Sequence, residues 1–120
     1  MPPDSGCLRR GDLYWVDWSP SPGSEQSGRR PALIVQLDPA NRNTTYPNTI
    51  VVTISRSGRD VPSHVPIDPA PGNGLRERSY AKCEQILTVN KDRLAGRIGH
   101  VTEETMAKVS DALKRMLAIE

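Results

Sequence analysis

The side chains of this chain best suited to chemistry on a phosphate are arginines, and several of them lie in its first half. The 120-residue sequence holds twelve arginines against four lysines. A planar guanidinium donates two parallel hydrogen bonds to phosphate oxygens and stacks on bases, whereas a lysine ammonium is a point charge. The arginines at expected strand ends or loops are Arg29, Arg30, Arg42, Arg56 and Arg59. Most arginines on most proteins are simply exposed to solvent. The placement of these five therefore makes contact with phosphate a hypothesis and no more.

Hydroxyl, carboxylate and imidazole side chains occur nearby in the sequence. Glu25 lies in a segment rich in Ser, Pro and Gly, and Ser55 ends an apolar run. Thr53 is two residues before Ser55, so the two share a face if the run is a strand. His64 is the natural proton carrier near neutral pH. These residue types are also common as ordinary surface or packed side chains, and alone they do not identify a site.

Charge and cysteine content exclude several classes of protein. The net charge of +2 is too small to identify a nucleic-acid binder by itself. Cys7 and Cys83 are too few and too far apart for a disulfide framework, and the histidines and acids lack metal-ligand spacing, so we expect no metal and no cofactor.

No apolar run approaches the length of a membrane span, and the N-terminus lacks a signal core. We therefore expect a cytoplasmic protein without a membrane anchor.

Turn-forming residues divide the chain into the short elements that must position these side chains. Eleven prolines and nine glycines favour β structure with loops over a helical bundle. Apolar and β-branched runs predict strands at residues 13–18, 32–36, 49–55 and 61–67, one or two more within 80–89, and a last short one at 97–101. The fourth is expected at a sheet edge because it contains Pro62 and Pro66. Loops are expected at residues 19–28, 38–48 and 68–74.

The C-terminal segment changes period and predicts a helix over about residues 102–118. Thr102 is a suitable N-cap, and acids precede bases along the segment as the helix dipole prefers. One helix face carries Met106, Val109, Leu113, Met116 and Leu117, which we expect to pack as core, with contact to a partner as the alternative. The whole chain is expected to be one domain over residues 1–120, mainly β, with strands over about 12–100 and a small, strongly bent sheet or barrel.

Four sequence blocks, in their order and spacing, resemble the MazF/PemK/Kid toxins, the ribonuclease halves of bacterial toxin–antitoxin pairs. The first block is RGDLYWVD at residues 10–17 with GSEQ at 23–26 and RRPALIV at 29–35. The others are TIVVTIS at 49–55, SHVPI at 63–67 and KCEQILTV at 82–89. The resemblance covers nearly the whole chain. It implies the SH3-like small β-barrel of the CcdB/MazF/Kid toxins, with a C-terminal helix and a homodimer.

The resemblance also implies roles for particular residues. Arg30 matches the family's catalytic arginine, which precedes proline at the start of the second strand. Because the pKa of free arginine is far too high for an ordinary base, we interpret Arg30 as a stabiliser of transition-state charge. Ser55 matches a hydroxyl residue that would hold a phosphate oxygen, with Thr53 as the fallback. Glu25 would accept the 2′-hydroxyl proton or bind a base. The expected RNA-contacting residues are Ser24, Arg29, Thr53, Arg56, His64 and Gln85.

The implied activity is that of a sequence-specific, metal-independent endoribonuclease toxin. It would cleave single-stranded mRNA by attack of the 2′-hydroxyl, leave 2′,3′-cyclic phosphate and 5′-hydroxyl ends, inhibit translation and growth, and be silenced by a cognate MazE-like antitoxin. Two other functions fit the same barrel: a non-enzymatic, CcdB-like toxin that poisons DNA gyrase, and an SH3-like adaptor that binds RNA or protein. Arg30 with Ser55 and the GSEQ segment favour the ribonuclease.

Overall fold

The structure is a computed structural model that describes residues 8–18 and 28–120. Its centre is one sheet of six antiparallel strands in the order β4-β5-β3-β2-β1-β6. The strands are β1 (Asp12–Asp17), β2 (Arg29–Ile34), β3 (Asn48–Ser55), β4 (His64–Ile67), β5 (Ser79–Asn90) and β6 (Leu94–His100). The helices are α1 (Asp38–Arg42), the 3₁₀ turn η2 (Lys91–Arg93) and α2 (Glu103–Met116). The expectation of a mainly β protein with a C-terminal helix is confirmed.

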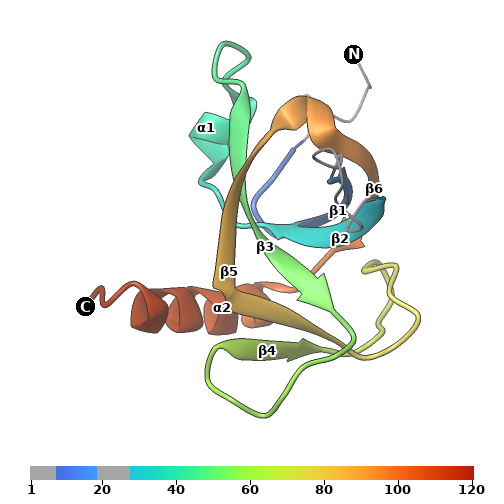
Figure 1. Cartoon of the computed structure of the whole chain (residues 1–120), viewed down its shortest axis with the longest axis vertical. Helices are drawn as coiled ribbons and strands as arrows, with labels where there is room; N and C mark the ends of the chain where they lie inside the picture. Colours follow the sequence, from blue (N-terminus) through green and yellow to red (C-terminus); the bar gives the residue numbers. More distant parts are fainter. Residues whose placement is uncertain (1–7, 19–27) are drawn as a thin grey trace, which may run out of the picture.

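The sheet is strongly bent but its hydrogen bonding does not close into a ring. Within the described residues β4 lies at one edge and β6 at the other. Figure 1 shows β5, η2 and β6 as one arch that carries the chain over the β1–β2 part of the sheet. The predicted edge strand is confirmed, because β4 pairs only with β5 and contains Pro66. This bending turns part of the sheet into a concave surface.

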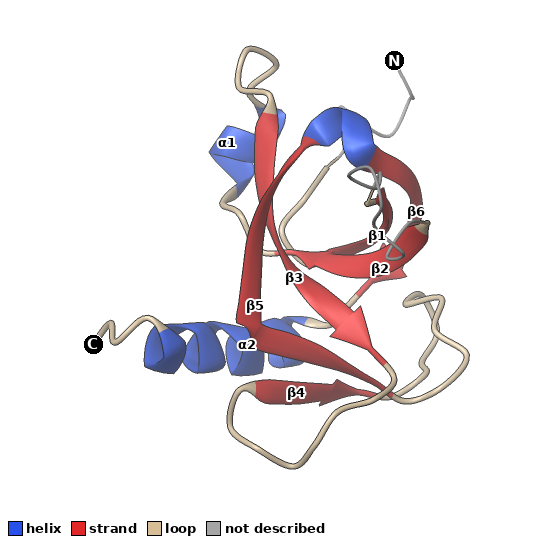
Figure 2. Cartoon of the chain, in the orientation of Figure 1, coloured by secondary structure: helices blue, strands red, loops and turns tan. Residues whose placement is uncertain are grey.

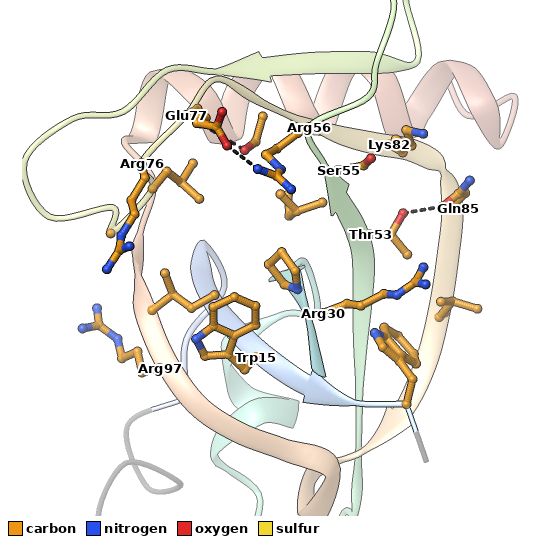
Figure 3. A pocket seen from close by; sticks show the side chains of 18 residues that line it. Trp15, Arg30, Thr53, Ser55, Arg56, Arg76, Glu77, Lys82, Gln85 and Arg97 are labelled. Atoms are coloured by element: carbon orange, nitrogen blue, oxygen red, sulfur yellow. Dashed lines mark hydrogen bonds and ion pairs between the residues drawn. The ribbon is translucent and has the colours of Figure 1, made fainter. Parts of the chain in front are cut away.

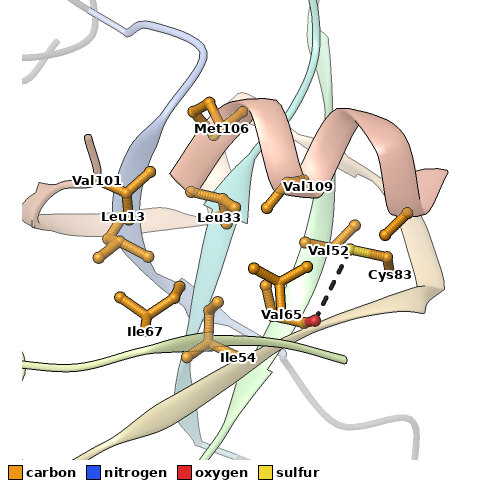
Figure 4. Close-up of a cluster of buried hydrophobic side chains, with 12 residues drawn as sticks. Leu13, Leu33, Val52, Ile54, Val65, Ile67, Cys83, Val101, Met106 and Val109 are labelled. Atoms are coloured by element: carbon orange, nitrogen blue, oxygen red, sulfur yellow. Dashed lines mark hydrogen bonds between the residues drawn. The ribbon is translucent and has the colours of Figure 1, made fainter. Parts of the chain in front are cut away.

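Two apolar clusters occupy the two faces of the sheet. The larger is covered by α2 and includes Leu13, Leu33, Val52 and Val109 (Figure 4). The smaller lies on the opposite face and is formed by Leu8, Tyr14, Val16, Ala32, Ile34, Val51 and Val89. Because successive strand residues point to opposite faces, each central strand contributes to both clusters. The backbone that carries the candidate site is therefore fixed from both sides.

Helix α2 confirms the predicted N-cap and corrects the predicted core stripe. The Thr102 hydroxyl accepts a hydrogen bond from the Thr105 backbone N–H at 3.1 Å. Met106 and Val109 are buried as expected, but Met116 and Leu117 are 46% and 54% exposed. Figure 2 shows the C-terminal end of α2 extending past β5, so the last turn has no strand beneath it. Within the helix, Ala112 is buried in their place.

The predicted loop over residues 38–48 is wrong at its start, where α1 forms. Pro39 stands in the first turn of this helix, a position that needs no N–H donor. Asn41 on α1 is buried and satisfied on both sides of its amide. Its Oδ1 accepts from Gln36 Nε2 at 3.0 Å and from Thr49 Oγ1 at 2.8 Å, and its Nδ2 donates to the Gln36 carbonyl at 2.9 Å. These bonds to residues outside the helix stabilise a helix too short to persist alone.

No helix in the described part of the chain is both long enough and apolar enough to cross a membrane.

Candidate nucleic-acid interface

Strand register brings Arg30 and Ser55 to matching positions on β2 and β3. The β2–β3 ladder begins at Ala32 opposite Thr53, directly after Pro31, which has no N–H to donate to a ladder. Two steps further along the same register, Arg30 would stand opposite Ser55. Alternation then puts Arg30, Thr53 and Ser55 on one face of the sheet. Arg30 is exposed, while its β1 partner Val16 is buried.

These residues line a broad groove of about 1340 Å³ (Figure 3). Its walls come from β1, β2, β3, β5, β6 and the loop before β5. The polar lining residues are Arg30, Thr53, Ser55, Arg56, Arg76, Glu77, Ser79, Lys82, Gln85 and Arg97. Its apolar part includes Trp15, Trp18, Pro31, Leu75, Leu87 and Ile98. A concave surface that combines arginines with the exposed ring of Trp15 suits a single-stranded nucleic acid.

A bulge in the β3–β5 ladder places Gln85 beside Thr53. Val52 pairs with Ile86, but the next residue, Thr53, pairs with Lys82, so β5 carries three extra residues between these two pairs. The Thr53 hydroxyl donates a hydrogen bond to Gln85 Oε1 across this bulge. Gln85 is itself one of the residues that line the groove (Figure 3). Gln85 thus holds Thr53 while lining the groove.

The Ser55 hydroxyl is also engaged, at the turn that follows β3. It accepts a hydrogen bond from the Ser57 backbone N–H at 3.1 Å. This leaves the hydroxyl proton for another acceptor, and the Ser57 carbonyl lies 3.5 Å away. Thr53 and Ser55 therefore both present hydroxyls in the groove, and each is oriented by a neighbour.

Arg56 and Glu77 form an ion pair between the end of β3 and the loop before β5. The hydrogen bond from Arg56 to Glu77, and the carboxylate charge, raise the pKa of Arg56 above its ordinary value. Both side chains are largely exposed, at 74% and 60%, so solvent screens this pair and its contribution to stability is small. A phosphate in the groove can compete with Glu77 for the guanidinium.

His64 lies outside this groove, in a neighbouring hollow of about 560 Å³ lined also by Arg59, Lys82 and Glu84. Its Nδ1 accepts from the Arg59 backbone N–H at 3.0 Å, so Nε2 carries the proton toward Glu84 Oε2 at 2.8 Å. Burial on its own would raise the pKa of Glu84. The net pKa is nevertheless below the ordinary value, because the carboxylate accepts hydrogen bonds from His64, its own backbone and Ser63 and is attracted by the charge of His64.

The structure does not gather all the predicted residues at Arg30. Arg29 pairs with Asp17 in the β1–β2 ladder and does not line the groove. His64 is separated from the groove by Lys82, which lines both the groove and the neighbouring hollow. Ser24 and Glu25 lie outside the described residues.

Sequence reasoning missed Trp15, Arg76, Glu77, Lys82 and Arg97 as lining residues. For Trp15 the period-two alternation was a usable signal, because its neighbours Tyr14 and Val16 are buried. Arg97 had no such signal, since only the pairing of β6 with β1 brings it near. Among residues 8–18 and 28–120, no three His, Cys, Asp or Glu side chains cluster so that they could hold a metal ion.

Comparison with known proteins agrees with this geometry. Residues 9–117 match a family model for the PemK-like, MazF-like toxin of type II toxin–antitoxin systems. The chain is 40% identical over 112 residues to endoribonuclease EndoA of Bacillus subtilis (strain 168), covering 93% of this chain and 96% of that protein. It is 36% identical over 116 residues to endoribonuclease MazF of Staphylococcus saprophyticus, covering 93% and 92%.

Solved structures extend the similarity to the fold. A mycobacterial endoribonuclease, solved in complex with its cognate antitoxin, superposes with a TM-score of 0.76 at 28% identity, covering 94% of this chain and 97% of that one. A MazE–MazF structure from Deinococcus radiodurans gives a TM-score of 0.76 at 23% identity, covering 94% and 97%. At that lower identity the likeness concerns the fold alone.

Proposed function

This chain belongs to the PemK-like, MazF-like toxin family of type II toxin–antitoxin systems, and from that membership we propose that it is a sequence-specific endoribonuclease that cleaves single-stranded mRNA. The observation that carries this proposal is the groove in which Arg30 shares a face with the hydroxyls of Thr53 and Ser55. Cleavage of mRNA would stop translation and so inhibit growth.

The reaction uses a nucleophile that RNA itself supplies. The 2′-hydroxyl loses its proton and attacks the adjacent phosphorus, the bond from phosphorus to the 5′-oxygen of the next nucleotide breaks, and that oxygen takes up a proton. The products are a 2′,3′-cyclic phosphate and a 5′-hydroxyl. Negative charge grows on the two non-bridging phosphate oxygens as the pentacoordinate state forms. We assign Arg30 the role of stabilising that charge, because its guanidinium can donate hydrogen bonds to both oxygens at once.

The Ser55 hydroxyl supplies a further donor to the same phosphate, and the Thr53 hydroxyl does so once its hydrogen bond to Gln85 is exchanged for one to the substrate. Each is held by a neighbour, so little side-chain freedom is lost when the substrate arrives. Arg56 and Gln85 extend the polar surface along the groove, for backbone and base contacts respectively. The 2′-hydroxyl proton is assigned to Glu25, which lies outside the described residues. The remaining sequence-based assignments, Ser24, Arg29 and His64, are contacts to the RNA flanking the cut.

The partners follow from the family. The chain acts in the cytoplasm as a homodimer, and a cognate MazE-like antitoxin blocks the groove. An antitoxin segment that competes with RNA must offer negative charge to the same arginines, so we assign it an acidic, flexible segment with apolar anchors. A monomer at micromolar concentration by light scattering would contradict the homodimer.

A cleavage assay tests the proposal directly. Purified protein is incubated with a long single-stranded RNA and excess EDTA, and the products are separated on a denaturing gel. Discrete fragments are expected, because the mechanism draws on side chains and the 2′-hydroxyl alone. If the RNA stays intact, the result would favour the non-enzymatic functions, namely a gyrase poison or a binding adaptor.

A further inference from the structure

Trp15 presents an open aromatic face inside the groove. The residue is 42% exposed, although the residues on either side of it, Tyr14 and Val16, are buried. Its neighbours across the sheet are Pro31 on β2 and Gly96 on β6. Neither carries a long side chain, and apart from Gly96 and its two chain neighbours no atom lies within 4 Å of where a Cβ on Gly96 would stand. The sheet therefore leaves the indole uncovered.

Arg97 pairs with Tyr14 on β1, lines the same groove as Trp15, and is held from behind by a buried carboxylate. Its Nη2 lies 3.3 Å from Asp12 Oδ1 and donates to His100 Nδ1 at 3.1 Å. The Asp12 side chain is only 4% exposed, and its other oxygen accepts from the Arg9 backbone N–H at 3.1 Å. The Arg97 side chain is 39% exposed and lines the groove. In Figure 3, Trp15 lies between Arg97 and Arg30.

We propose that Trp15 and Arg97 form a subsite for one nucleotide that flanks the cleaved bond, with the indole stacked on its base and the guanidinium on its phosphate. The inference rests on the proposed ribonuclease function and adds a second anchoring point to the one at Arg30. Stacking tolerates every base, because each base has a π-face. The subsite therefore fixes the position of the strand in the groove and adds affinity without reading base identity.

The test is a thermodynamic coupling between Trp15 and one base. The probe is a short single-stranded RNA with every 2′-hydroxyl methylated, which blocks cleavage, and it is replaced by an abasic unit at one position at a time. For the wild type, one position should weaken binding by about tenfold, a typical loss for one stacked base. With Trp15→Ala, the intact probe should already bind about tenfold more weakly, and the abasic unit at that position should cost nothing more.

A conservative variant and a second readout separate stacking from a structural role. Trp15→Phe keeps an aromatic face and should retain most of the coupling. In a Trp18→Phe background, where Trp15 is the one tryptophan left, the intact probe should quench the fluorescence and the critical abasic probe should quench it less. Additive losses from Trp15→Ala and from every abasic position would overturn the proposal. So would conversion of the dimer to monomers by Trp15→Ala, since the indole would then belong to the subunit interface.

Arg97 is tested through the salt dependence of the same binding. Each phosphate contact on a single strand contributes about 0.7 to the slope of log affinity against log salt concentration. Arg97→Gln should lower the slope by about that amount, whereas Arg115→Gln, on the exposed face of α2, should leave it unchanged. An unchanged slope for Arg97→Gln would overturn its assignment. Because binding is the readout, a wild type that binds the probe but leaves unmodified RNA intact would count against the proposed function alone.

Discussion

The Thr53 hydroxyl is hydrogen-bonded to Gln85 Oε1 across the bulge between β3 and β5. This bond fixes the Thr53 hydroxyl and the Gln85 amide relative to each other and inside the groove that contains Arg30. The Ser55 hydroxyl is held instead by the turn at Ser57. Both hydroxyls remain candidates for the phosphate, and mutation can rank them.

Ser55→Ala is expected to slow cleavage clearly, whereas Ser55→Thr, which keeps the hydroxyl, should be tolerated. The reason is the loss of one donor to a phosphate oxygen beside Arg30. The measurement is kcat/KM on a defined RNA, with Thr53→Ala and Thr53→Ser as the matched pair. If Thr53→Ala is damaging while Ser55→Ala is neutral, the phosphate-holding hydroxyl is two residues earlier than the resemblance implies.

Arg30→Ala should lower the cleavage rate by about two to three orders of magnitude, as loss of one charge-stabilising group typically does. Arg30→Lys should also be poor, because a point charge cannot replace the bidentate contact. The thermal unfolding midpoint should change little, since Arg30 is exposed. Arg115→Ala is the control, because Arg115 is exposed on α2 and does not line the groove. Cleavage by Arg30→Ala within a few-fold of wild type would remove Arg30 from the mechanism.

Replacing the ribose at the scissile nucleotide by 2′-deoxyribose should protect that RNA from cleavage, because the attacking hydroxyl is then missing. Binding should persist, since the phosphates are unchanged. Product ends from the unmodified RNA should carry a 5′-hydroxyl, detectable by direct labelling with polynucleotide kinase and no prior phosphatase step. Cutting of the deoxy-substituted strand at the same bond would refute attack by the 2′-hydroxyl.

Glu84 should make stability depend on pH in the acidic range. Its pKa in the folded chain lies below the ordinary value of 4.5, so the stabilisation is fully present above that value and is lost as the pH falls through the lowered pKa. Glu84→Gln should therefore unfold at a lower temperature than wild type at neutral pH, with the difference shrinking below pH 4.5. Glu104→Gln, at an exposed helix carboxylate, should show no comparable difference.

Cys83 should resist alkylation in the folded protein. It is fully buried, and burial, with the nearby Glu84 charge, raises its pKa to about 11. Only about one thiol in a thousand is then ionised at about pH 8, and the thiolate is the reactive form. In a Cys7→Ser background, iodoacetamide labelling followed by mass spectrometry should be slow until denaturant is added. Fast labelling of the native protein would show that β5 opens readily.

Local sequence patterns were sufficient for most of the secondary structure. Alternating and continuous apolar runs placed the strands, Pro62 and Pro66 placed the edge strand, and Thr102 placed the start of α2. These features depend on residues near one another in the chain, where periodicity and capping apply. The same patterns did not predict α1. This helix forms because the buried Asn41 side chain hydrogen-bonds to Gln36 and Thr49, and no helical periodicity in the sequence indicates those bonds.

The composition of the groove was decided by the tertiary structure. The sequence placed Arg30, Thr53 and Ser55 on strands. They lie on one face of the sheet because side chains alternate along each strand and because of the register in which β2 pairs with β3. Gln85 reaches Thr53 only because β5 carries three extra residues at the bulge, and Arg97 reaches the groove only because β6 pairs with β1. His64 is diverted into the neighbouring hollow by Glu84. Register shifts and pairings between distant strands depend on how the whole sheet packs, so a single sequence carries no local signal for them.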